Sequence, residues 1–288
     1  MKTRRIIILF SILAFAATVV LLNSFVFSVR EVRAYCFNSV DETLKERVVE
    51  KSGIELYKNI IVLNEKKAVK NIENEMPGEV KVINIERKFP DKVWIHFVKL
   101  VPVIAVETGE FETGEKKYAA CEFYNHNLSV IDAGVPASAL LFDAAADGVD
   151  KEIDGARPVV RAAIKGSVVN PQVAKPLELS EPDALLALCG IVDTINSLGY
   201  REHDFVRLLK EIDISGYGDA VNPVAFLKMR DNTVNGITIE IQNAKLFLLE
   251  KVQHAISAYE QYLAGTLTFS TVNWTVYNNS KNEIIIAG

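Results

Sequence analysis

The sequence has few of the residues that hold small or metal-bound proteins together. Only three cysteines, Cys36, Cys121 and Cys189, occur among 288 residues, and they are widely spaced. An odd set of this kind excludes a disulfide framework and predicts buried free thiols. The four histidines are isolated, so no zinc site is expected. Acidic residues between 143 and 154 lack the spacing of a calcium loop and predict a solvated surface segment.

Positive charge is also in deficit. Lysine and arginine total 32 against 37 acidic residues, which gives a net charge of −5 at pH 7. Binding to nucleic acid through phosphate neutralisation needs the opposite balance, so no nucleic-acid partner is expected. Hydrophobic residues make up 49% of the chain, which excludes intrinsic disorder. The length suits about two domains.

Sequence motifs of phosphate-binding loops and of catalytic nucleophiles are missing as well. Gly109 and Gly114 have the spacing of a phosphate loop, but Glu115 and Lys116 follow where lysine and serine or threonine are needed. No Ser-x-x-Lys and no Gly-x-Ser-x-Gly sequence occurs. The sequence therefore predicts no enzyme, and no catalytic, cofactor-binding or metal-binding residues.

One long uncharged run is present, from 6 to 29. As a helix its 24 residues would extend about 36 Å, against about 30 Å of hydrocarbon in a bilayer. The run predicts a membrane-spanning helix after a cytoplasmic stub over 1–5, with the N-terminus inside and the bulk of the chain outside. The alternative is a cleaved signal peptide that ends at Ala14-Phe15-Ala16.

The segment from 30 to 107 predicts a small unit in the order strand, helix, helix, strand, strand. Ser39 with Glu42 predicts a capping box for the first helix. Asn64 is the expected start of the second helix. Two β-rich runs, Glu79–Arg87 and Lys92–Val98, predict a hairpin.

The segment from 108 to 288 predicts a sheet with helices packed on it, hence an α+β fold. Its expected elements are a hairpin over Lys117–Asp132, a helix after Pro182, three strands between Leu209 and Ile241, a long helix capped by Asn243, and closing strands at Thr266–Tyr277 and Glu283–Ile286. The role of the intervening Ala133–Lys175 stretch stays open.

The order of these parts resembles the FtsQ/DivIB family of bacterial cell-division proteins, in which a single membrane span precedes a POTRA domain and a β domain. The residues that carry the resemblance are Phe27-Ser28-Val29, Asn59-Ile60, Val80-Lys81-Val82, Arg87-Lys88-Phe89-Pro90, Val93-Trp94-Ile95, Pro102-Val103, Ile237–Ile241 and Lys251. The chain departs from the family at Tyr35-Cys36 and Lys58, where glycines are usual, and at Lys99-Leu100, where Glu-Arg is common.

The resemblance implies a membrane helix over 6–29, a POTRA-like domain over 30–107 and a β domain over 108–288. It implies a non-enzymatic scaffold of the divisome, located in the cytoplasmic membrane at the division septum. Such a scaffold would bind FtsB/DivIC- and FtsL-type partners and septal peptidoglycan synthases, and so assemble and regulate septal peptidoglycan synthesis.

The resemblance also implies where partners bind, because the last strands of the β domain receive a partner's strand in that family. The candidate partner-binding residues on the closing strands are Phe269, Trp274, Tyr277, Ile284 and Ile286. Trp274 and Tyr277 are the preferred contacts, since aromatic residues dominate interface hot spots.

Three alternatives follow from the same sequence. A membrane-anchored cell-wall hydrolase or peptidase would need a nucleophile or metal ligands. A translocation factor of an outer membrane would need several POTRA units or a barrel of regular amphipathic strands. A cleaved, secreted binding protein would need processing of the first residues.

Overall fold

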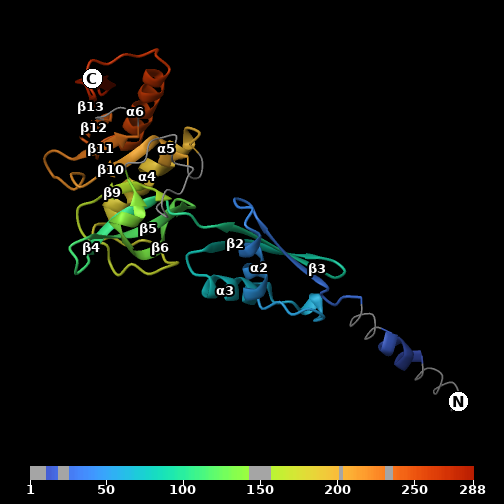
Figure 1. The fold of residues 1–288 in the computed structure, drawn as a ribbon. Coiled ribbons are helices and arrows are strands. Elements are labelled where there is room, and N and C mark those ends of the chain that lie inside the picture. Colours follow the sequence, from blue (N-terminus) through green and yellow to red (C-terminus); the bar gives the residue numbers. More distant parts are fainter. Residues whose placement is uncertain (1–10, 19–25, 143–156, 201–203, 231–235) are drawn as a thin grey trace. The chain divides into compact units, whose positions relative to one another are not determined.

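A computed structural model describes residues 11–18, 26–142, 157–200, 204–230 and 236–288 (Figure 1). The chain divides into two compact units, Met1–Leu100 and Val101–Gly288. The division falls before strand β4 (Ile104–Glu110), whereas the predicted boundary at 107/108 falls inside that strand. Each unit has its own hydrophobic core.

The predicted membrane helix over 6–29 is corrected by the structure. Among the described residues, no helix is long and apolar enough to cross a membrane. At the end of that span, residues 26–29 are not helical, and Ser28 forms a β-bridge with Asn59. Residues 6–10 and 19–25, like the stub over 1–5, lie outside the described residues. The structure therefore does not support a fold class that includes a membrane helix. It also removes the basis for the predicted single-pass location in the cytoplasmic membrane.

The first unit contains a three-stranded sheet covered by two helices. Its elements are β1 (Glu31–Cys36), α2 (Glu42–Lys51), the short 3-10 helix η1 (Ile60–Val62), α3 (Glu65–Glu75), β2 (Val80–Lys88) and β3 (Lys92–Lys99). The strand order is β1-β3-β2, with β1 parallel and β2 antiparallel to β3. The order along the chain is strand, helix, helix, strand, strand, as the sequence pattern predicted.

Side-chain caps decide where the two helices of this unit begin. The Asn64 side chain accepts a hydrogen bond from the Lys67 amide at 3.0 Å, which starts α3 as predicted. The capping box at Ser39 is wrong, because Asp41 caps α2 by accepting from the Leu44 amide at 3.1 Å. Ser39 instead accepts from the Asp41 amide and forms a turn before the cap.

The second unit is built on a nine-stranded sheet in the order β14-β13-β12-β11-β10-β9-β4-β5-β6. After β4 its strands are β5 (Lys116–Tyr124), β6 (Asn127–Pro136), β9 (Val160–Ala163), β10 (Leu209–Asp213), β11 (Val224–Met229), β12 (Thr238–Gln242), β13 (Asn273–Asn278) and β14 (Ile284–Ala287). The short strands β7 (Leu140–Leu141) and β8 (Arg157–Pro158) form a separate pair, and a 3-10 turn η2 (Ala137–Ala139) precedes β7.

Three helices accompany this sheet: α4 (Pro182–Ser197), α5 (Phe205–Leu208) and α6 (Leu248–Leu263). Helices α4 and α6 pack against each other, and α6 also contacts β12, β13 and β14 (Figure 1). The predicted cap of α6 at Asn243 is wrong. Asn243 and Phe247 both have left-handed backbone conformations, which interrupt the helix until Leu248.

Two buried cations tie this unit together. Lys251 of α6 is fully buried, and its Nζ donates to the carbonyls of Gln242 at 2.7 Å and Asn243 at 3.1 Å. This bond fixes α6 to the end of β12. The guanidinium of Arg230, after β11, donates to carbonyl oxygens of distant segments, among them Val206 at 2.8 Å, Phe142 at 3.1 Å, Val159 at 3.1 Å and Leu209 at 3.3 Å.

Candidate partner-binding site

Each main sheet has two edge strands, and one edge of each sheet is protected. On β2 the ladder is interrupted by a register shift between Val82 and Asn84, and Lys81 and Lys88 carry charges along the strand. Bulges and lysines are the usual protection of an edge against pairing. On β6 the segment 174–177 covers the edge, since the Val130 amide donates to the Lys175 carbonyl at 2.9 Å.

The opposite edge of the large sheet, β14, is open. Among the described strands it pairs only with β13, with Tyr277 opposite Ile285. The Asn279 amide donates to the Glu283 carbonyl at 3.0 Å. Because inward and outward groups alternate along an antiparallel ladder, Ile285 bonds toward β13, and the backbone groups of Ile284 and Ile286 point outward.

Apolar side chains flank this edge on both faces. Phe269, Ile284 and Ile286 are half-buried and pack against the core on the side of α6. Tyr277 and Ile285, which alternate with them, lie on the other face of the sheet and are also half-buried. A strand added to β14 would therefore cover apolar surface above and below its backbone. Ile285 was missing from the sequence-based candidates, although its alternation with Ile284 and Ile286 could have placed it beside Tyr277.

Trp274, one of the two contacts preferred from the sequence, is buried in the second unit. Its side chain is 1% exposed, its Nε1 donates to the Thr271 carbonyl at 3.0 Å, and its ring packs 4.2 Å from that of Phe269. The rings of Tyr259 and Tyr262 from α6 also pack against it. Trp274 therefore supports Phe269 from within the core, and Phe269 remains partly accessible.

The thiols of the second unit do not form a nucleophilic site. Burial raises the pKa of Cys189 to about 11 and that of Cys121 still further. Cys189 lies one helical turn before Asp193, and Oδ1 of Asp193 is 2.8 Å from Nδ1 of His126. These three residues are of the types that form a cysteine-based catalytic site. However, only a thiolate attacks, and these thiols stay protonated at neutral pH. Cys36, in the first unit, is half-buried and free.

Metal-ligand groupings are absent from the part of the chain that the structure describes: no three histidine, cysteine or acidic residues come together there. The acidic residues between 143 and 154 lie outside it. Glu122 is a buried acid whose pKa is raised to about 7 by burial alone. A single buried carboxyl group of this kind makes the stability of the second unit depend on pH. It is not by itself a ligand-binding site.

Comparison with known proteins gives no family for this chain, since neither a protein-family model nor a curated protein matches it. The resemblance to FtsQ/DivIB therefore rests on the order of the parts and on the residues named above.

Proposed function

We propose that the chain is a non-enzymatic scaffold of the bacterial division machinery, which binds partner proteins by accepting an extended segment at the open edge of β14. Two observations support the proposal. The order of the parts resembles FtsQ/DivIB, and β14 combines an unpaired backbone edge with apolar side chains on both faces. The second observation carries the proposal, because it supplies a surface suited to a partner strand.

Strand addition uses the two kinds of group that this edge offers. Main-chain hydrogen bonds to Ile284 and Ile286 would give affinity, and contacts with alternating side chains would give specificity. Partners of the FtsB/DivIC and FtsL type, followed by septal peptidoglycan synthases, are those that the resemblance implies. The mechanism is then positional: the chain holds its partners together and so assembles and regulates septal peptidoglycan synthesis.

The test compares two substitutions at one outward-facing position. Ile286→Pro removes the outward amide, and Ile286→Ala removes the same side chain but keeps that amide. Binding of the full chain to the FtsB/DivIC–FtsL-type pair of the same bacterium is measured by titration calorimetry, with thermal unfolding to check both variants. We expect the proline variant to bind about tenfold more weakly than the alanine variant. Equal affinities in the two variants would contradict strand addition at β14.

A further inference from the structure

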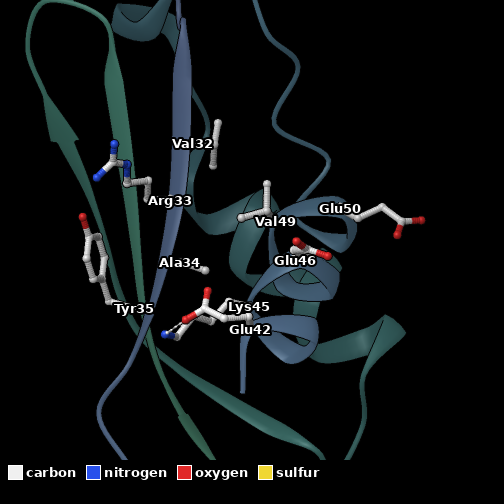
Figure 2. Close-up of a pocket in the computed structure, with 9 residues that line it drawn as sticks. All are labelled: Val32, Arg33, Ala34, Tyr35, Glu42, Lys45, Glu46, Val49 and Glu50. Carbon is white, nitrogen blue, oxygen red and sulfur yellow. Dashed lines mark hydrogen bonds and ion pairs between the residues drawn. The ribbon is translucent and has the colours of Figure 1, made fainter. Parts of the chain in front are cut away.

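The first unit also has an open edge, and this one lies in a groove. Strand β1 forms one wall and α2 the other, and the groove has a volume of about 580 Å³. Figure 2 shows Val32 and Ala34 directed from β1 toward α2, where Val49 lies close to them. Ligand sites in proteins commonly have volumes of about 300–1,000 Å³, so the groove is large enough to hold a ligand.

The backbone of β1 presents unused hydrogen-bonding groups to this groove. The Phe37 amide donates to the Phe97 carbonyl at 3.1 Å, which in the parallel register places the odd-numbered residues of β1 in bonds toward β3. At the start of the strand the amides of Arg30 and Glu31 both donate to the Asp91 carbonyl, at 2.7 Å and 3.3 Å. The even-numbered residues Val32 and Ala34 therefore direct their N–H and C=O groups outward, away from β3. Among the described strands, β1 pairs with β3 alone.

The floor of the groove is apolar because the polar side chains of β1 lie on its other face. Tyr35 stacks on His96 with ring centroids 5.5 Å apart, and Arg33 forms an ion pair with Glu31. Figure 2 shows both side chains directed away from α2. Val32, Ala34 and Val49 form the apolar part of the lining, and Arg33 and Tyr35 contribute to its margin on β1.

The helical wall carries negative charge. Glu42, Glu46 and Glu50 follow one another at intervals of four residues along α2. The single cation on this wall, Lys45, is engaged by Glu42 at 2.7 Å. Glu46 forms no ion pair with any residue that the structure describes, and it is exposed. A ligand with positive charge over Glu46 would complement this wall.

We propose that this groove binds an extended segment of a partner protein with lysine or arginine at alternate positions, paired as an added strand with β1. Its main chain bonds to the outward groups of Val32 and Ala34. Its side chains alternate, so every second one faces α2. A long basic side chain fits there, because its aliphatic stem covers Val49 and the apolar floor while its charged end reaches Glu46. This site lies in a different unit and on a different edge from β14.

The probe is a fluorescently labelled short peptide in which lysine and valine alternate, and its binding to the full chain is followed by fluorescence anisotropy. We expect the lysine peptide to bind and to be weakened by added salt. A peptide of the same length with glutamate in place of lysine should not bind. Equal binding of the two peptides would overturn the proposal.

Charge reversal on the helical wall locates the site. Glu46→Lys should weaken binding of the lysine peptide about tenfold, because an attraction becomes a repulsion at close range. Glu75→Lys, at an exposed position of α3 outside the groove, is the matched control and should leave binding unchanged. Both substituted residues are exposed, so neither variant is expected to unfold the first unit. Equal effects of the two variants would contradict the assignment to this groove.

Loss of one outward amide tests the strand pairing itself. Ala34→Pro should abolish peptide binding, whereas Ala34→Ser, which keeps the amide, should retain it. Ile286→Pro on β14 should leave peptide binding unchanged, which separates this site from the proposed division site. Full binding by Ala34→Pro would rule out the added strand, and loss of binding in Ile286→Pro would place the peptide on the other edge.

Discussion

The two units each leave one sheet edge open, but they surround it differently. β14 has apolar side chains on both faces, including Ile284 and Tyr277. β1 lies beside an acidic helix, with Glu46 above an apolar floor. An unpaired edge offers the same backbone groups to any strand, so the side chains around it must select the partner. The comparison suggests that the two edges serve chemically different segments.

The interiors of the units differ as well. All the buried charged residues of the described chain, Glu122, Glu211, Arg230 and Lys251, belong to the second unit. The first unit buries only Ser28 and Ser52 among polar residues. A large sheet with distant connections is thus joined by charge-assisted hydrogen bonds, whereas the small unit relies on apolar packing. Substitution of these buried charged residues is therefore the most direct test of whether the two units are stabilised in different ways.

The largest effect is expected from Arg230→Met. The change leaves the carbonyls of Phe142, Val159, Val206 and Leu209 without this donor, and we expect the second unit to lose about 3–5 kcal/mol of unfolding free energy. Urea unfolding measures the loss. Arg47→Met, which breaks an exposed pair with Glu79 in the first unit, is the control and should cost less than about 1 kcal/mol. Similar losses in both variants would contradict the assigned role.

A smaller loss is expected from Lys251→Met. The carbonyls of Gln242 and Asn243 would be left unsatisfied, which costs about 2–3 kcal/mol. Hydrogen exchange should speed up first at the end of β12 and the start of α6. Uniform acceleration throughout the second unit would instead show that Lys251 acts on the whole fold and not on this junction.

The pH dependence of stability follows from Glu122. Burial raises its pKa to about 7 in the folded state from an ordinary 4.5, so folding favours the protonated acid. The contribution is complete below pH 4.5 and is lost as the pH rises through 7, by about 3 kcal/mol in total. Unfolding of the second unit at pH 5 and pH 8 should show this loss, and Glu122→Gln should reduce it. An unchanged pH profile in the variant would assign the effect to another group.

The smallest effect on stability is expected from Tyr277→Ala, because this side chain is half-buried on a sheet face. We expect a loss of about 1 kcal/mol or less in unfolding free energy. Affinity for the proposed division partner should nevertheless fall about tenfold. Tyr124→Ala, an exposed tyrosine at the end of β5, is the matched control for partner binding. Equal affinities for the two variants would remove Tyr277 from the site.

The order of strands and helices could be predicted because local patterns encode it. Asn64 provides a cap within its own turn, and the alternation in β3 repeats every second residue. The burial of Trp274 could not be predicted, since it depends on rings from α6 and from the loop before β13. The hydrogen bonds of Arg230 could not be predicted either, because an acceptor such as the Phe142 carbonyl is distant in sequence.

The membrane helix is the reverse case, because the sequence predicted an element that the structure does not support. A count of uncharged residues over 6–29 measures hydrophobicity and assumes a helix throughout, whereas residues 26–29 form a turn and a β-bridge, and no described helix is long and apolar enough to cross a membrane. Sheet order was also beyond the sequence. Nothing local predicts that β9 inserts between β10 and β4, and this insertion leaves β14 and β6 at the two margins.

The shortness of β14 limits how long a complex at this edge can last. Only Ile284 and Ile286 direct their backbone outward, so a visiting strand gains about four hydrogen bonds, with a net value of about 4 kcal/mol. Alone, that corresponds to a dissociation constant of about 1 mM. Tight association would need further energy from side chains, and a partner that loses those contacts would leave quickly. Such an edge is suited to a reversible complex, which the proposed role in division would require.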